Sequence, residues 1–192
     1  IQPNIVFTFT IKPNVYCGIA CATMKIPYVA NITGLGTAIE NGGLIQKISL
    51  ILYKFGLRKA QKVFFQNYEN RDFMLKKNIV NSPYGMLPGS GVNLNQYKVL
   101  KYPNGDIVNF VFISRILKEK GIDQYLAAAE VMRKKYPITR FHVCGFCEQE
   151  YEEKLKSLND NGTIIYHGRV NNTVDIHAIS QCTIHPTYYP EG

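Results

Sequence analysis

The amino-acid sequence predicts an α/β protein in which helices cover parallel β-sheets. Apolar, β-branched and aromatic runs of strand length alternate with longer segments of helical period along the chain. The composition agrees with this class, because apolar residues make up 46% and charged residues 19% of the 192 residues, as in packed proteins rather than disordered ones.

The strands and helices follow one another in a regular order. In the helix predicted at 122–135, apolar residues recur at helical spacing and form one buried face, with Ile122, Tyr125, Leu126, Ala129 and Met132 as its members. Strands are predicted at residues 5–9, 28–31, 62–66, 108–114, 140–144, 163–166 and 182–185, and helices at 14–24, 43–59, 68–77, 122–135, 149–158 and 172–179.

A connection rich in Gly, Pro and Asn runs from Leu87 to Asp106 and predicts two domains, residues 1–98 and 107–192, with a boundary near 98–106. The net positive charge is also confined to the first half of the chain. Residues 1–100 hold eleven Lys and Arg against three Asp and Glu, whereas residues 101–192 hold eleven of each sign. This asymmetry predicts an anionic partner for the first half, such as lipid headgroups or nucleic acid.

Neither a membrane span nor a secretory signal is expected. No apolar run approaches the length of roughly 18 residues that a spanning helix needs, and the start lacks the features of a signal peptide. The five cysteines, an odd number, favour reduced thiols over a disulfide framework. These features predict a cytoplasmic protein.

Two basic residues follow the strand predicted at 108–114. Arg115 comes directly after it, and Lys120 stands before Gly121 and the next helix, so both cations reach the carboxyl edge of the sheet, where the free N–H groups of the helix also point. This arrangement can bind a diphosphate. A solvated loop that holds Lys118 as well is the simpler interpretation of the segment alone.

Glu191 and Gly192 end the segment PTYYPEG, which follows the strand predicted at 182–185. The carboxylate of Glu191 is expected at the same edge as Arg115, where it can accept hydrogen bonds from sugar hydroxyl groups. An acid before a helix more often only stabilises the helix N-terminus.

The first half has comparable strand ends. The segment FTIKPNVYCGIA places Pro13 in the first turn of a helix and Lys12 and Asn14 at the carboxyl edge, and NITGLG brings Gly34 and Gly36 to the next strand end. A tight turn explains NITGLG as well as a binding loop does, and its spacing is not that of a dinucleotide site.

The segment from Leu44 to Lys62 is apolar and basic. On one helix, Lys47, Lys54, Arg58 and Lys62 would share a stripe about 80° wide, which is typical of helices on anionic membranes. A surface helix packed on the sheet is an equal alternative.

The remaining candidates have simpler structural explanations. CGFC at 144–147 can suggest a redox pair or half a zinc site, but Gly145 fits a turn after a strand. Among the histidines only His185 is expected near the cleft, and a structural role remains the alternative for it.

The ordered motifs TIKPN, TGLG, FFQN, PGSGVNL, SRILKEKG, YHGRV and HPTYYPEG span nearly the whole chain. Together they resemble the group 1 glycosyltransferases of family 4, which have the two-domain GT-B fold. The first four are similar to the bacterial branch that acts on capsule, O-antigen and lipid-linked oligosaccharides.

The resemblance implies a site for a nucleotide-sugar donor in the second domain. Arg115 and Lys120 match the basic pair that binds the diphosphate, and Glu191 matches the first Glu of a Glu-x7-Glu pair, whose second Glu has no counterpart here. Many relatives have a histidine at about the position of Thr10, so a histidine-based role does not carry over. The implied catalytic residues are Arg115, Lys120 and Glu191, the donor-binding residues also include Gly168, Pro186 and Gly192, and the cleft or acceptor candidates are Thr10, Lys12, Asn14, Thr33, Gly34 and Gly36.

The implied activity is retaining transfer of a sugar, an N-acetylhexosamine or related hexose, from a UDP-linked donor to a lipid-linked saccharide in surface polysaccharide synthesis. The resemblance implies neither a metal nor another cofactor, no nucleic acid, and a peripheral place on the inner face of the cell membrane. Because the glycine-rich loop and the second Glu of the family are missing, we expect an inactive fragment in which both Rossmann-like domains are incomplete. A non-catalytic α/β module that binds an anionic surface is the alternative.

Overall fold

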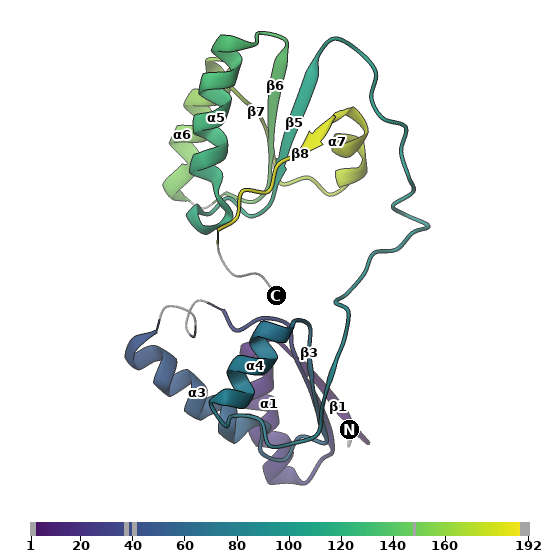
Figure 1. Cartoon of the computed structure of the whole chain (residues 1–192), viewed down its shortest axis with the longest axis vertical. Helices are drawn as coiled ribbons and strands as arrows, with labels where there is room; N and C mark the ends of the chain where they lie inside the picture. The colour runs from purple at the N-terminus through teal and green to yellow at the C-terminus, as the bar shows by residue number, and fades with distance from the viewer. Residues whose placement is uncertain (1–2, 37–38, 40–41, 148, 189–192) are drawn as a thin grey trace. The chain divides into compact units, whose positions relative to one another are not determined.

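The computed structural model describes residues 3–36, 39, 42–147 and 149–188 and contains two separate parallel sheets (Figure 1). The chain divides into two compact units between Val92 and Asn93. This division precedes the expected boundary at 98–106 because the connection packs on the second unit, where the side chain of Gln181 donates hydrogen bonds to the carbonyl oxygens of Pro103 and Ile107.

The first unit has a sheet of order β1-β2-β3-β4. Its strands pair in parallel and in sequence order, and helices make the connections. The elements are β1 (Val6–Phe9), α1 (Ile11–Met24), β2 (Tyr28–Ile32), α3 (Gly43–Leu57), β3 (Lys62–Phe65), α4 (Tyr68–Lys76) and β4 (Tyr84–Met86).

Helix α1 begins at Ile11, three residues before the predicted start. The N–H of Asn14 donates to the carbonyl oxygen of Thr10 at 3.1 Å and makes the first bond of the helix. Pro13 therefore lies in the first turn, where its missing N–H leaves no partner unpaired.

Strand β4 has no counterpart among the predicted strands. Tyr84–Met86 holds a glycine and has no apolar run, and it becomes a strand only by pairing with β3, where Val63 is opposite Tyr84. Strand propensity depends strongly on the surroundings of a segment, and here the pairing with β3 makes the segment a strand.

The predicted four-cation stripe at 44–62 is wrong for Lys62. Helix α3 ends at Leu57 and Lys62 begins β3, so Lys62 does not share a helix face with Lys47 and Lys54. Leu50, Tyr53 and Leu57 bury one face of α3 in the core of the first unit.

The second unit has a sheet of order β7-β6-β5-β8, again parallel. Helices α5 and α6 cover one face, and α7 lies beside β5 and β8 (Figure 1). The elements are β5 (Val108–Ile113), the 3-10 turn η1 (Lys118–Lys120), α5 (Ile122–Lys135), β6 (Thr139–Cys144), α6 (Gln149–Asp160), β7 (Ile165–Gly168), α7 (Thr173–Ile179) and β8 (Cys182–Thr183).

The predicted buried face of α5 is confirmed. Ile122, Tyr125, Leu126 and Ala129 are each at most 1% exposed, and Met132 packs against the same core cluster. The hydroxyl of Tyr125 also donates to the carbonyl oxygen of His142 at 2.9 Å. This bond ties the helix to the backbone of β6.

Within the described residues, no helix is both long and apolar enough to cross a membrane.

Candidate functional site

The loops that follow the strands of the second unit meet at the carboxyl edge of its sheet. The N–H of Ser114, after β5, donates to Cys144 at 3.1 Å, and the N–H of Gly145, after β6, donates to Gly168 at 2.8 Å. Ile116 continues this ladder by donating to Phe146 at 2.9 Å. The backbone of three neighbouring loops is therefore held together at one edge.

Two glycines allow these loops to approach so closely. Gly145 has φ 156° and Gly121 has φ 76°. A Cβ atom on Gly145 would lie 1.7 Å from the carbonyl oxygen of Ser114, and one on Gly121 would lie 2.1 Å from that of Pro186. The turn expected at Gly145 is confirmed, and Pro186 is brought against the start of α5.

Arg115 and Lys120 lie on the segment between β5 and α5. Arg115 is exposed, Ile116 beside it is fully buried, and Lys120 is half-buried at the end of η1. The buried Ile116 anchors this short loop in the core, so the two cations are carried by a fixed backbone. The N-terminus of α5, which begins at Ile122, adds the positive end of a helix dipole.

One carboxylate stands in the first turn of α5. Asp123 accepts hydrogen bonds from Lys154 Nζ at 2.8 Å and from the Tyr151 hydroxyl at 2.9 Å. The bond from Lys154 is the main reason that the pKa of Asp123 lies below its usual value. Both partners come from α6, so the carboxylate of Asp123 links the start of α5 to α6.

The segment after β8 crosses the start of α5. Thr187 donates from its hydroxyl to the carbonyl oxygen of Glu119 at 3.2 Å, and Pro186 contacts Gly121. The segment that holds Pro186 therefore lies against the turn that precedes α5. Glu191 and Gly192 lie outside the described residues.

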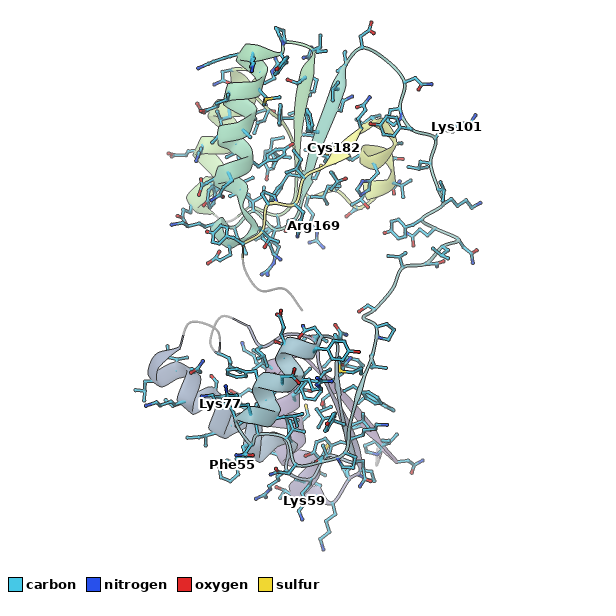
Figure 2. All side chains as sticks on the ribbon, in the orientation of Figure 1. Phe55, Lys59, Lys77, Lys101, Arg169 and Cys182 are labelled. Atoms are coloured by element: carbon cyan, nitrogen blue, oxygen red, sulfur yellow. The ribbon has the colours of Figure 1, made fainter. Side chains whose placement is uncertain are left out.

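Gly168 ends β7 at the same edge, with φ 63°. The exposed Arg169 follows it and adds a third cation to the strand ends (Figure 2). Sequence reasoning missed Arg169, although the signal was present in YHGRV as a basic residue directly after a strand.

A histidine pair, formed by the buried His142 and the half-buried His167, lies on neighbouring strands. His142 Nδ1 is 2.8 Å from His167 Nε2, and His142 Nε2 is 3.0 Å from Asn109 Oδ1. Burial, together with the neighbouring His167, lowers the pKa of His142 to about 4. His142 is thus a satisfied structural histidine. His185 follows β8 and is exposed.

The cysteines of CGFC occupy structural positions. Cys144 is buried at the end of β6, where burial raises its pKa to about 11, and Cys147 forms an isolated bridge with Ile116. A raised pKa disfavours the reactive thiolate. Within the described part of the chain, no group of three or more His, Cys, Asp or Glu residues is arranged to hold a metal ion.

The first unit has its own set of candidates at the carboxyl ends of β1 and β2. Thr10 is exposed and adopts φ 66° and ψ 173°, a region that residues other than glycine rarely occupy. Lys12 is exposed in the first turn of α1. Gly36 has φ 69°, and a Cβ atom added to it would lie 2.8 Å from Ile11 Cδ1. The segment Thr33–Gly36 therefore lies close to the start of α1, next to Thr10 and Lys12.

Asn14 does not face the edge as expected. It is fully buried, and its side-chain Nδ2 donates to the carbonyl oxygen of Asn31 at 2.9 Å. The side chain therefore links α1 to the backbone of β2 and is not exposed at the edge.

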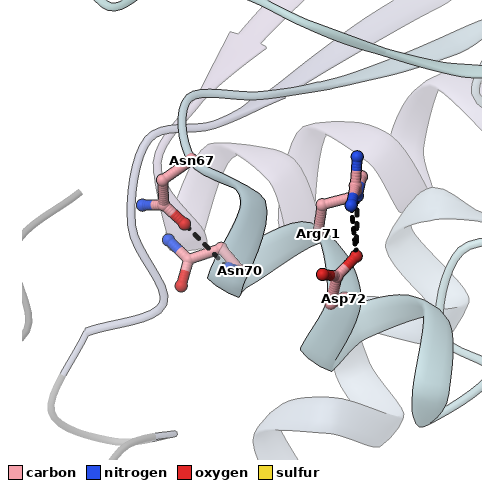
Figure 3. Close-up of polar contacts among 4 residues, drawn as sticks. All are labelled: Asn67, Asn70, Arg71 and Asp72. Carbon is pink, nitrogen blue, oxygen red and sulfur yellow. Dashed lines mark hydrogen bonds and ion pairs between the residues drawn. The ribbon is translucent and has the colours of Figure 1, made fainter.

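The FFQN motif serves as a helix cap. The side chain of Asn67 accepts a hydrogen bond from the N–H of Asn70 at 2.7 Å, and Arg71 pairs with Asp72 at 2.7 Å (Figure 3). A capping asparagine explains this residue at the carboxyl end of β3 without a ligand.

Comparison with known proteins agrees with this architecture. Residues 98–192 match the family model described as Glycosyl transferases group 1. No curated protein matches the chain significantly.

Several solved structures share the fold. The crystal structure of TarM, a protein of S. aureus, has a TM-score of 0.68 at 14% identity over 97% of this chain and 37% of TarM. Apo OtsA, a trehalose-6-phosphate synthase, has a TM-score of 0.72 at 12% identity over 100% of this chain and 54% of OtsA. A trehalose-6-phosphate synthase from a study of glycosyltransfer with retention has a TM-score of 0.64 at 13% identity over 93% of this chain and 50% of that chain. The pneumococcal O-GlcNAc transferase GtfA, in complex with UDP and GlcNAc, has 0.53 at 12% over 89% and 40%.

The chain therefore spans little more than half of OtsA and less of TarM. Similarity at these identities describes the fold. The chain has the α/β GT-B fold of these structures, and its residues 98–192 match the glycosyl transferases group 1 family.

Proposed function

We propose that the protein is a retaining glycosyltransferase that moves an N-acetylhexosamine or related hexose from a UDP-linked donor to a lipid-linked saccharide in surface glycan synthesis. One observation carries this proposal. In the unit that matches the glycosyltransferase family, the loops after β5, β6, β7 and β8 converge at one edge, and Arg115 and Lys120 both lie on the loop that precedes α5.

The chemistry of these groups suits a departing diphosphate. A guanidinium group binds phosphate oxygens through two parallel hydrogen bonds, and an ammonium group adds a mobile point charge. The α5 N-terminus contributes free N–H groups to the same anion. In our proposal these groups take the part that a divalent metal plays in other transferases, and they stabilise the charge that develops as the sugar bond breaks.

The donor sugar would lie toward the segment that follows β8. Pro186 positions this segment against Gly121, and Glu191 is proposed to accept hydrogen bonds from the sugar hydroxyl groups. Gly168 and Gly192 complete the proposed donor-binding set, because glycines permit close approach of backbone to ligand. Arg169 extends the cationic character of the edge.

The solved structures support the choice of donor and stereochemistry. GtfA was solved with UDP and GlcNAc, a TarM mutant with UDP and alpha-GlcNAc-glycerol, and the trehalose-6-phosphate synthase study concerns transfer with retention. We propose the same donor class and the same outcome for this protein. For the acceptor we propose the edge of the first unit formed by Thr10, Lys12, Thr33, Gly34 and Gly36.

Kinetics of single variants test the proposal. In the protein expressed from its complete natural coding sequence, Arg115→Ala and Lys120→Ala should each lower turnover on the order of 100-fold. Lys134→Ala removes an equal charge from the last turn of α5 and should leave turnover unchanged. If both site variants retain full activity, the assignment of the diphosphate site is wrong.

The stereochemistry is tested separately. The anomeric configuration of the first-formed product, followed by NMR, should match that of the donor sugar. An inverted product contradicts the retaining mechanism but leaves the diphosphate site intact. Absence of any sugar transfer from UDP-linked hexoses, with UDP binding lost as well, would favour the non-catalytic binding module.

A further inference from the structure

Helix α3 carries a second apolar face that points away from the core. Its inward face consists of the buried Leu50, Tyr53 and Leu57. At 100° per residue, six other apolar side chains lie on roughly the opposite side of the helix. These residues, which we call the outer face of α3, are Leu44, Ile45, Ile48, Ile51, Leu52 and Phe55, and each is 38% to 72% exposed.

Such a face is unusual on the surface of a protein. A helix that is apolar all round is normally buried, and contiguous exposed apolar patches mark interaction sites. None of the six residues belongs to the buried cluster of the first unit or to the partly buried residues around it, as far as the described residues go. We therefore expect a partner with an apolar surface to cover the outer face.

Basic side chains border the outer face on one side. Lys47, Lys54 and Arg58 lie along one of its borders, and Lys59 follows directly. No Asp or Glu occurs in the sequence between Glu40 and Glu69. The guanidinium carbon of Arg58 lies 5.9 Å from the centroid of the Phe55 ring, so this cation sits at the margin of the apolar surface.

We propose that the outer face of α3 inserts into the headgroup region of a membrane that contains anionic lipid. Acyl chains would cover the apolar residues while lipid phosphates neutralise Lys47, Lys54 and Arg58, as for other basic amphipathic helices that lie in the interface. A second copy of the chain fits less well, because α3 brings no carboxylate to pair with the cations of its partner.

The length of α3 specifies how it lies on the bilayer. The helix has 15 residues, and a span needs about 20 residues at a rise of roughly 1.5 Å each. It lies in the plane of the interface, with Leu50 and Tyr53 still packed in the protein. This inference does not depend on sugar transfer and is tested without a donor or an acceptor.

Vesicle sedimentation provides the first test. The chain should sediment with vesicles of phosphatidylcholine and phosphatidylglycerol, and far less with phosphatidylcholine alone. The charge variant Lys47→Gln/Lys54→Gln/Arg58→Gln should bind anionic vesicles roughly 100-fold more weakly, since each cation contributes roughly fivefold. The apolar variant Ile48→Gln/Ile51→Gln/Phe55→Gln should lose more than about tenfold.

Matched controls separate this face from general charge and hydrophobicity. Lys134→Gln/Lys135→Gln/Lys156→Gln removes the same charge from exposed positions of the second unit and should cost far less binding than the charge variant. Met24→Gln/Val131→Gln/Ile138→Gln removes exposed apolar residues that lie elsewhere and should bind as the unchanged chain does. Circular dichroism checks that each variant keeps its helices.

A fluorescence experiment locates the contact. The chain has no tryptophan, so Phe55→Trp introduces a single reporter on the outer face. Its emission should shift to the blue when anionic vesicles are added. Tyr136→Trp is the control, because Tyr136 is also exposed and also has a cation, Lys135, 5.3 Å from its ring centroid, but lies in the second unit.

Two results would overturn the proposal. In the first, the charge and apolar variants bind vesicles as tightly as the unchanged chain. In the second, the chain does not bind vesicles but self-associates in solution, and the apolar variant is monomeric by light scattering. The second result would assign the outer face to an interface between copies.

Discussion

The carbonyl oxygen of Pro186 occupies the space that a Cβ atom on Gly121 would need, at a distance of 2.1 Å. Gly121 precedes α5, and Pro186 follows β8. These residues are far apart in the sequence, and their contact closes the carboxyl edge of the second unit beside Lys120.

Gly121→Ala should displace the segment around Pro186 and weaken the proposed donor site. The added methyl group meets backbone, which cannot give way as a flexible side chain can. We expect a lower thermal midpoint and weaker UDP binding by calorimetry. Gly162→Ala is the matched control, because Gly162 has nearly the same φ, 75°, but open space around its Cβ position. Equal effects of the two variants would show that backbone conformation, and not the contact with Pro186, is responsible.

Gly18→Ala should destabilise the first unit although alanine favours helices. A Cβ atom on Gly18 in α1 would lie 2.2 Å from the carbonyl oxygen of Gly56 in α3, which also accepts a 2.6 Å bond from the Tyr28 hydroxyl. Overpacking of about 1 to 3 kcal/mol should exceed the gain in helix propensity of about 1 kcal/mol. Denaturant unfolding measures the change. Cys17→Ala, on the exposed side of the same helix, should be near neutral, and a stabilised Gly18→Ala variant would contradict the close packing of α1 on α3.

Thr10→Gly should stabilise the first unit by about 1 kcal/mol. Thr10 has φ 66° and ψ 173°, where strain of about 1 to 3 kcal/mol exceeds the entropy that glycine adds to the unfolded chain. Lys25→Gly is the comparison, since Lys25 has φ 58° and ψ 32°, an ordinary left-handed conformation with less strain. Chemical denaturation should show the larger gain for Thr10→Gly, and the reverse order would mean that Thr10 is not strained.

The histidine pair predicts loss of stability in acid. The pKa of His142 is about 4 in the folded chain, below the usual value of about 6.5, so the unfolded chain takes up a proton that the folded chain does not. This contribution is fully present above about pH 6.5 and is lost as pH falls toward 4, at up to about 1.4 kcal/mol per pH unit. His167, whose pKa burial also lowers, acts in the same direction.

Urea unfolding at several pH values tests this dependence. His142→Gln should be less stable near neutral pH, because the bonds to His167 and Asn109 change, but it should lose less stability between pH 6.5 and 4. His177→Gln removes an exposed histidine and should keep the original pH dependence. An unchanged acid profile in His142→Gln would assign the loss to other groups.

The fold class and much of the second unit follow from local patterns in the amino-acid sequence. The period of Ile122, Tyr125, Leu126 and Ala129 predicts the buried face of α5, because helical geometry places residues three and four apart on one side whatever they pack against. The position of Arg115 and Lys120 at a strand end likewise follows from local order along the chain. The order of motifs suggested the glycosyltransferase family that residues 98–192 match.

Other features depend on contacts between segments that are distant in the sequence. Strand β4 forms by pairing with β3, and the buried side chain of Asn14 bonds to the backbone of Asn31 on another element. Because α3 ends at Leu57, Lys62 does not belong to the basic stripe. The outer apolar face of α3 is defined by the packing of Leu50 and Tyr53 in the core, which leaves the opposite side of the helix exposed. Periodicity specifies which residues share a side of an element, but the packing of other elements decides which side is covered, and that information lies in no single stretch of sequence.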